Sequence, residues 1–401
     1  MRIGVIGAGH AGVEAARRAS ELGAQVVLFS SESVLPYFRP KVVALAFGQV
    51  DLHGIYLRPE PWYREQGIDL RLNCEVIHLE ARSKAVTAGG SEERFDALII
   101  ATGAAPSPLA VGQELPDDVI ALWGVRESLT IRDRLARTRD LLVLGGGISG
   151  VESALYARDA GLDVTVVEKM GRVIPQQLGW SAAGVLTHRL RRAGVNVVTG
   201  RHAVTVSKQG DRLHVALDDG RELICDLVLT TVGATRKLTL FEQAGLKTDR
   251  GVVVDEQLQT SVPGIFACGD IAQRGNTPTT TVIRAHAQGR GAGENALAFT
   301  QGRELASIPE PISPLLFRHK DVEVQSVGPA AGDGLAEKVL TNDGETVYRS
   351  VLLDNGKLCG VQMIGSRDGF RQLLDSLNQP WQEAASQILA SPANNKMGNL
   401  T

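Results

Sequence analysis

The sequence has 401 residues, of which 43% are hydrophobic and 22% are charged, and its formal net charge is −3. Such a chain is expected to fold into two or three globular domains, and its near-neutral charge indicates no nucleic-acid partner. The first predicted strand begins at Arg2, and no apolar run approaches the roughly 20 residues that span a bilayer. We therefore expect no signal peptide, no membrane segment and a cytoplasmic location.

The first predicted element is an apolar strand that runs into a glycine-rich turn and then into a helix. In IGVIGAGHAGVEAA, residues 3–16, the turn places Gly7, Gly9 and Gly12 in a G-x-G-x-x-G pattern, with His10 and Ala11 inside it. This pattern brings bare backbone and a helix N-terminus to a nucleotide diphosphate. We call such a glycine-rich turn, with the strand before it and the helix after it, a cradle. One match is weak evidence in a chain with 44 glycines, but this one stands between a predicted strand and a predicted helix.

A second cradle of the same design follows. The stretch LLVLGGGISGVESA, residues 141–154, again joins an apolar strand to a helix, and the pattern consists of Gly145, Gly147 and Gly150, with Ile148 and Ser149 before the last glycine. Two matches in the same context predict two dinucleotide-binding sites rather than two ordinary tight turns.

The residue that ends the next strand differs between the two cradles. Glu168 follows Gly150 at the same spacing as Ser30 follows Gly12. A carboxylate there accepts hydrogen bonds from both hydroxyls of an adenosine ribose and repels a 2′-phosphate, so the second cradle is predicted to prefer NADH over NADPH. The first cradle has Ser30 in this place and Glu32 as its nearest acid, which leaves its ribose contact open.

The repeat extends beyond the cradles. Residues 67–103 and 194–233 are both polar, strand-rich segments that return to an apolar strand and end in a turn, Ala101-Thr102-Gly103 in the first and Val232-Gly233 in the second. We interpret this as an internal duplication. The predicted fold is α/β, with two Rossmann-like dinucleotide-binding domains that each carry a small antiparallel meander.

With these motifs, the chain resembles the two-dinucleotide flavoprotein reductases related to glutathione reductase over nearly its whole length. The resemblance implies FAD at the first cradle and NAD(P)H at the second. The stretch GIFACGDIA, residues 264–272, is similar to the second FAD motif of that family, which implies that Gly269 and Asp270 bind the ribityl and phosphate region. A helix predicted from a Thr277 cap to about Phe299 would then point its N-terminus, with Thr280, at the flavin.

The region that carries redox cysteines in the disulfide reductases of this superfamily has none. It reads VLPYFRPKVVALAFGQV, residues 34–50, and the four cysteines of the chain are scattered. The likelier role of Cys74, Cys225, Cys268 and Cys359 is therefore that of small buried thiols. Without a disulfide relay, the flavin must pass its electrons to an acceptor outside the chain.

The replacing segment SSESVLPYFRP is similar to the corresponding stretch of rubredoxin and ferredoxin reductases. The resemblance implies that Arg39 helps to hold the FAD diphosphate, with a solvated surface arginine as the alternative. Many ferredoxin reductases carry a lysine shortly after this point, where this chain has Val42-Val43-Ala44, so Lys41 is the candidate substitute.

Three residues are predicted to lie near the nicotinamide from the same resemblance: Glu152, Val232 and Gly233. For Glu152, a helix-surface glutamate in the first turn is the alternative explanation. The eight histidines show no ligand spacing and join no cysteine cluster, so we predict no metal. A proton-transferring base is not required either, because hydride passes directly between the two cofactors.

The duplication sets the predicted domain boundaries. We place an FAD-binding domain at residues 1–110 and 240–308, an NAD-binding domain at 111–239, and a small C-terminal α+β domain at 309–401 that ends in a mobile tail. In the third domain, a strand is predicted over 322–327, hairpin turns at 342–344 and 354–356, and a helix over 370–377. This domain resembles the C-terminal domain of rubredoxin reductases.

The expected function is an NADH-dependent FAD reductase that passes electrons to a small iron redox protein of the rubredoxin or ferredoxin type. Basic residues near the flavin edge could steer an acidic carrier, although a scattered solvated rim explains them equally well; they are Arg39, Lys41, Arg318 and Lys320. The alternatives are an electron-transfer subunit for nitrite or nitrate reduction, an NADH oxidase, and an NADH-sensing flavoprotein similar to apoptosis-inducing factor. The oligomeric state stays open.

Overall fold

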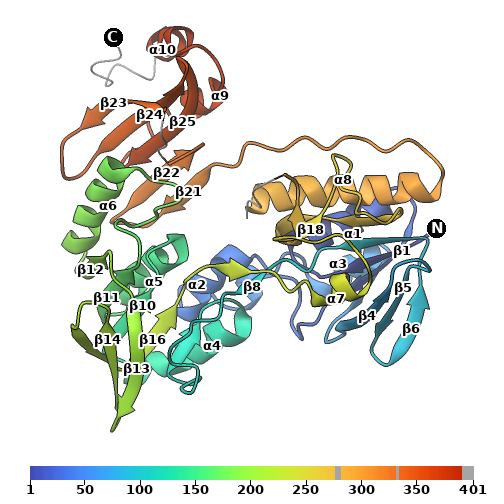
Figure 1. Ribbon diagram of the computed structural model, residues 1–401, viewed down its shortest axis with the longest axis horizontal. Coiled ribbons are helices and arrows are strands. Elements are labelled where there is room, and N and C mark those ends of the chain that lie inside the picture. Colours follow the sequence, from blue (N-terminus) through green and yellow to red (C-terminus); the bar gives the residue numbers. More distant parts are fainter. Residues whose placement is uncertain (276–280, 331–333, 391–401) are drawn as a thin grey trace. The chain divides into compact units, whose positions relative to one another are not determined.

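The computed structural model describes residues 1–275, 281–330 and 334–390, the last five of these by their backbone alone. The chain divides into two compact units, which are described separately (Figure 1). The first unit combines Met1–Lys41, Val50–Ala105 and Ala234–Ser313, and the second combines Val42–Gln49, Pro106–Gly233 and the chain from Pro314 onward. The boundaries of the three predicted domains stay predictions.

The first unit is built on a five-stranded parallel sheet with the order β3-β2-β1-β7-β19. Its strands are β1 (Arg2–Ile6), β2 (Gln25–Phe29), β3 (Ile68–Arg71), β7 (Ala97–Ile100) and β19 (Ile265–Ala267). In the central strand β1, every residue after Arg2 is buried, as expected of a parallel strand covered on both faces. The apolar strands that follow the first cradle motif in the sequence are therefore paired around it.

Two long helices of this unit lie side by side, α1 (His10–Glu21) and α8 (Val282–Thr300) (Figure 1). Their contact is close because small residues meet there. A side chain on Gly289 of α8 would collide with the carbonyl oxygen of Ala11, and one on Gly293 with that of Ala15. The cradle helix α1 is thus held from the side by α8.

The start of α8 differs from the prediction. The helix begins at Val282, and its N-cap is Thr281, whose hydroxyl accepts a hydrogen bond from the Arg284 N–H at 3.2 Å. The same hydroxyl lies 3.0 Å from that of Ser313, so the following linker helps to select this cap. The predicted cap Thr277 is therefore wrong; Thr277 and Thr280 lie outside the described residues.

The smaller elements of the first unit surround this sheet. The antiparallel meander consists of β4 (Val76–Glu80), β5 (Ala85–Ala88) and β6 (Ser91–Arg94). The remaining elements are η1 (Arg39–Lys41), η2 (His53–Ile55), α3 (Glu60–Glu65), α7 (Thr239–Gln243), β18 (Val252–Val253), η4 (Gly269–Ile271) and β20 (Ala272–Gln273). The chain passes between the units at β8 (Ala105–Pro106) and β17 (Ala234–Thr235).

The second unit repeats the design with a parallel sheet of order β12-β11-β10-β16-β9. Its strands are β9 (Val119–Ala121), β10 (Asp140–Leu144), β11 (Asp163–Glu168), β12 (Val195–Thr199) and β16 (Leu227–Thr230). The meander consists of β13 (Ala203–Gln209), β14 (Arg212–Leu217) and β15 (Glu222–Cys225). The helices are α2 (Val42–Ala46), α4 (Val125–Arg134), η3 (Leu135–Arg137), α5 (Ile148–Asp159) and α6 (Trp180–Arg192).

The two sheets confirm the predicted duplication. Four strands follow the same order in each sheet: the third strand of the repeat, then the second, then the first, then the strand that follows the meander. These are β3-β2-β1-β7 in the first unit and β12-β11-β10-β16 in the second. The fifth strand of each sheet comes from a different place in the chain. In the second unit, β9 precedes the cradle strand β10, whereas in the first unit β19 follows both repeats in the sequence. This is the arrangement expected when one dinucleotide-binding domain is inserted into another.

The C-terminal part of the second unit is a five-stranded antiparallel sheet of order β21-β22-β25-β24-β23 (Figure 1). Its strands are β21 (Leu315–Arg318), β22 (Glu323–Val327), β23 (Ala336–Asn342), β24 (Tyr348–Asp354) and β25 (Lys357–Ile364), followed by α9 (Phe370–Asp375) and α10 (Trp381–Ala390). Both hairpins turn where predicted. The α10 helix was not predicted.

A buried polar row joins this sheet to α6. Ser326, Gln362 and Ser350 stand in register across three strands and are almost fully buried. The Gln362 side chain accepts a hydrogen bond from the Gly179 N–H, the N-cap of α6, at 2.8 Å, and the Ser326 hydroxyl donates one to the Gln177 carbonyl at 2.8 Å. These bonds satisfy the buried side chains of Gln362 and Ser326.

The described part of the chain contains no helix long and apolar enough to cross a membrane. The predicted cytoplasmic location stays a prediction.

The contact between α1 and α8 gives a stability prediction. Gly289→Ala places a methyl group against the Ala11 backbone, which cannot yield as a side chain would, and should lower the free energy of unfolding by about 1–3 kcal/mol. Gly184→Ala is the matched control, because Gly184 lies within α6 with open space around it and should gain about 1 kcal/mol in helix propensity. Urea unfolding of the two variants measures both; equal effects would contradict the account of the helix contact.

Candidate functional site

The first cradle separates its glycines into packed and open positions. Gly7 has a φ of 104°, and a side chain there would collide with the Ala101 carbonyl, while one on Gly12 would collide with the carbonyl of Gly7. At Gly9, the N-cap of α1, a Cβ would meet nothing within 4 Å. The packed glycines hold the turn together, and the open one leaves bare backbone at a helix N-terminus, which fits a diphosphate.

The segment after β2 brings Arg39 toward this cradle. The Arg39 guanidinium donates to the Glu32 carboxylate at 3.0 Å and lies over the Tyr37 ring at 5.2 Å. Its positive charge also acts on His10, the first residue of α1. Arg39 and Glu32 are therefore partners at the mouth of the first cradle. The neighbouring Lys41 is exposed at the end of η1.

Asp270 lies beside both helices, in η4. Gly269, in the left-handed region at a φ of 73°, fits against Ala11, and its N–H donates to the buried Gln288 side chain at 2.9 Å. Within the described residues no hydrogen bond reaches the Asp270 carboxylate, while its backbone carbonyl accepts one from Arg236. Burial raises the pKa of Asp270 against the pull of Arg236, Arg39 and Arg284. A half-buried carboxylate without a partner fits the hydroxyl groups of a ligand.

The turn after β7 completes the floor of the first cradle. The Ala101 N–H donates to the Ile6 carbonyl at 2.8 Å, which extends the pairing of β1 and β7 by a residue. Thr102 follows, and Gly103 adopts a φ of 70°. These residues lie beneath Gly7, where the sequence repeat places them.

The second cradle has the same geometry. Gly145 has a φ of 112°, a side chain on Gly150 would collide with the Gly145 carbonyl, and Gly147 is open, with nothing within 4 Å of an added Cβ. Ile148 and Ser149 form the first turn of α5. Two independent cradles thus share one pattern of packed and open glycines.

Glu168 is bound into the second cradle through its carboxylate. It is 8% exposed at the end of β11, and its two oxygens accept hydrogen bonds from the N–H groups of Gly146 at 2.6 Å and Met170 at 2.7 Å. Ser30, its counterpart in the first unit, accepts from the N–H of Glu32 at 3.2 Å. Both side chains therefore brace the backbone two residues further along, but only Glu168 brings a negative charge.

Glu152 is a half-buried acid in α5, five residues after Gly147, the open glycine of the second cradle. Burial raises its pKa to about 7, and within the described residues its carboxylate has no hydrogen-bond partner. The helix α2, which contains Val42, Val43 and Ala44, is entirely buried and packs on α5. The carboxyl group therefore titrates near neutral pH.

The turn after β16 contains the other two residues predicted for the nicotinamide side. Val232 is 40% exposed, which is unusual for a large apolar side chain next to a buried strand. Gly233 has a φ of 110°, and its carbonyl accepts from the Ser107 N–H at 3.0 Å. The exposed apolar surface and the glycine turn fit a planar ligand ring.

The four cysteines are all free. Cys225 and Cys268 are buried, which raises the pKa of each thiol to about 12, and Cys74 and Cys359 are half-buried. Cys225 and Cys268 are therefore poor nucleophiles at neutral pH.

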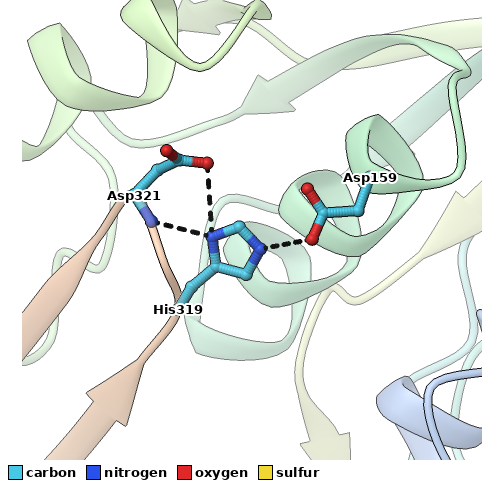
Figure 2. A group of neighbouring side chains, drawn as sticks. All are labelled: Asp159, His319 and Asp321. Atoms are coloured by element: carbon cyan, nitrogen blue, oxygen red, sulfur yellow. Dashed lines mark hydrogen bonds and ion pairs between the residues drawn. The ribbon is translucent and has the colours of Figure 1, made fainter.

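Figure 2 shows a cluster with metal-ligand chemistry that the sequence analysis missed, formed by Asp159, His319 and Asp321. His319 Nε2 lies 2.9 Å from the Asp159 carboxylate, Nδ1 accepts from the Asp321 N–H at 3.3 Å, and Lys320 binds the second Asp159 oxygen at 2.7 Å. Both ring nitrogens are thus occupied, and a cation already neutralises the acid. We interpret the cluster as an anchor between the end of α5 and the C-terminal sheet.

Two further residues of the first site were also missed by the sequence analysis, His286 and Arg236. His286 lies on α8 with its Nε2 3.1 Å from Nδ1 of His10, and Arg236 donates to the Asp270 carbonyl. No motif contains either residue, so only the folded chain reveals them.

Comparison with known proteins identifies the family of this chain. Residues 1–289 match the family model described as pyridine nucleotide-disulphide oxidoreductase. The chain is 35% identical to the rubredoxin-NAD(+) reductase of Pseudomonas putida, over 88% of this chain and 92% of that protein. It is 33% identical to the ferredoxin–NAD(+) reductase subunit of the benzene 1,2-dioxygenase system of Pseudomonas putida, over 78% of this chain and 77% of that protein.

Among solved structures, the chain is similar to the covalent putidaredoxin reductase–putidaredoxin complex, with a TM-score of 0.86 and 25% identity over 97% of this chain and 99% of that one. Family members of this kind use FAD and NAD(H), which agrees with two cradles of the same design in one chain. The chain belongs to the pyridine nucleotide-disulphide oxidoreductase family.

Proposed function

We propose that the chain carries electrons from NADH through FAD to a small iron redox protein of the rubredoxin or ferredoxin type. The observation that carries the proposal is the pair of cradles, of which only the second holds a carboxylate at the end of its second strand. Two relatives are named rubredoxin-NAD(+) reductase and ferredoxin–NAD(+) reductase, and a similar structure is that of putidaredoxin reductase joined to putidaredoxin.

The first cradle would hold FAD. The bare backbone at Gly9 and the free N–H groups of the first turn of α1 would bind the diphosphate, and Arg39 would supply a nearby positive charge. The Asp270 carboxylate, which lacks a protein partner among the described residues, would accept hydrogen bonds from the sugar-alcohol side of the cofactor. When bound, FAD supplies the ability to accept a hydride and to release electrons singly.

The second cradle would hold NADH. Gly147 leaves the same opening at the start of α5, and Glu168 would accept from the ribose hydroxyls while it keeps its bonds to the two backbone N–H groups. A carboxylate oxygen can accept more than one hydrogen bond, so the protein bonds do not exclude the ligand bonds. A 2′-phosphate would face this buried negative charge, which supports the choice of NADH over NADPH.

The acceptor is proposed to lie outside the chain. Residues 34–50, where the disulfide reductases carry their redox cysteines, contain no cysteine, so no disulfide relay is available there. Two of the four basic residues proposed for steering are neutralised by ion pairs, Arg39 with Glu32 at 3.0 Å and Lys320 with Asp159 at 2.7 Å. Exposed Arg318 and Lys41 remain as the candidates for attracting an acidic carrier.

The experiment that tests this function is anaerobic stopped-flow reduction by NADH, followed by mixing with oxidised rubredoxin, with nitrite reductase or with air. Fast reoxidation by rubredoxin alone is expected. Equally fast reoxidation by air would identify an oxidase, and reoxidation by nitrite reductase would identify a nitrite-reducing subunit. Slow reoxidation by every acceptor would favour a sensing role.

Glu168→Gln tests the choice of nicotinamide cofactor. The amide keeps one backbone hydrogen bond but loses the charge, so kcat/KM with NADH should fall about tenfold or more while that with NADPH rises relative to it. The flavin content should not change, because Glu168 belongs to the other cradle. Glu222→Gln, an exposed position on β15, is the matched control. An unchanged ratio of NADH to NADPH activity would contradict the role of Glu168.

Glu152→Gln tests the titration of the acid in α5. The pKa of Glu152 is raised to about 7, so the group is neutral below this pH and negative above it. A negative charge stabilises the positive nicotinamide ring that forms as hydride leaves, so flavin reduction should accelerate with rising pH in the natural chain. The variant should show a flat profile over the same range. If the rate of flavin reduction in Glu152→Gln still rose with pH, the titrating group would be another residue.

A further inference from the structure

A pair of histidines lies at the first cradle and has no role in the function proposed above. His10 is the first residue of α1 and is buried, and its Nδ1 lies 3.1 Å from Nε2 of His286 on α8. At this distance one nitrogen donates a hydrogen bond and the other accepts it. We call His10 and His286 the histidine pair.

The surroundings of His10 oppose a positive charge on its ring. The pKa of His10 is lowered to about 4 by burial, by His286 and by Arg39. The Phe38 ring covers His10 edge-on, with 5.0 Å between ring centroids, and the second nitrogen of His10 is buried without a protein partner among the described residues. His10 is therefore neutral at neutral pH in the cofactor-free chain.

The other charged groups around the histidine pair are already matched. Glu14, one turn further along α1, binds Arg17, and Arg284 on α8 binds Glu310 at 2.9 Å. Asp270 in η4, which contacts both helices, is acted on by Arg236, Arg39 and Arg284. Arg39 is paired with Glu32 at 3.0 Å, and its positive charge still contributes to the lowered pKa of His10.

A diphosphate at the first cradle would reverse the sign of this environment. His10 is the first residue of α1, and in an α-helix the bond from Cα to Cβ tilts toward the N-terminus, so its side chain starts at the end where the diphosphate would bind. The two negative charges would offset Arg39 and favour the charged form of an imidazole beside them. The second imidazole would share the added proton through the existing hydrogen bond.

We propose that binding of FAD at the first cradle is coupled to the uptake of a proton by the histidine pair. The proposal rests on the proposed function only in taking FAD as the ligand of this cradle. Because the bound state holds the additional proton, FAD affinity should fall as pH rises between the pKa of His10 in the free chain, about 4, and the higher pKa of the FAD-bound pair, by up to about tenfold for each pH unit in this range. Between these two pKa values the FAD-bound pair would be a cation beside the cofactor.

The test measures FAD affinity against pH without any turnover. The full-length holoprotein is diluted at a series of pH values, and the released FAD is quantified by its fluorescence. Calorimetry of FAD binding to the FAD-stripped full chain, in buffers that differ in ionisation enthalpy, counts the protons taken up. The variants are His10→Asn and His286→Asn, and the matched control is His78→Asn at an exposed position on β4.

The natural chain and His78→Asn should take up a proton and lose affinity with rising pH, whereas both pair variants should bind FAD with little dependence on pH. His286→Asn is decisive if His10→Asn fails to retain FAD, since His286 lies on α8 and not in the cradle. No proton uptake in the natural chain, or uptake that persists in His286→Asn, would overturn the proposal. A natural chain that binds no FAD at all would instead refute the proposed function.

Discussion

The close approach of bare backbone to a diphosphate is the constraint on which the rest of this chain depends. A ligand with two negative charges can reach the free N–H groups of a helix only if no side chain stands in front of them. In both cradles the turn is held by glycines that pack on neighbouring backbone, Gly7 and Gly145, while Gly9 and Gly147 leave the approach open. The buried parallel strands and the helix that braces α1 serve to hold these turns in place.

Duplication of one such cradle, followed by divergence at single positions, accounts for the difference between the two sites. Ser30 and Glu168 both brace the backbone two residues further on, so either residue satisfies the fold. Only Glu168 adds a charge suited to ribose hydroxyls. In the first unit, the acid near Ser30 is Glu32, which is paired with Arg39. The entrance of the first cradle therefore carries one negative and one positive side chain. Under the proposed function, this difference at equivalent positions would separate a site for a resident cofactor from one for a visiting cofactor.

The features that could be predicted from the sequence are those carried by local spacing. Glycine spacing and apolar runs predicted both parallel sheets, and turn residues predicted the C-terminal hairpins. The start of α8 was misplaced because several threonines could cap it, and the contact of Thr281 with Ser313 depends on a distant linker. The histidine pair could not be predicted, because His10 and His286 are separated by 276 positions and belong to no shared motif.

The central claim is that each cradle holds a different dinucleotide, and paired substitutions test it most directly. Gly9→Val and Gly147→Val each add a side chain where the structure has open space, so each should block one cradle while the fold stays intact. Flavin content and anaerobic bleaching of the flavin by NADH are measured in both variants. The account predicts that Gly9→Val is colourless but still binds NADH, and that Gly147→Val is yellow but is not bleached by NADH. The reverse pattern, or loss of flavin in both variants with unchanged stability, would contradict it.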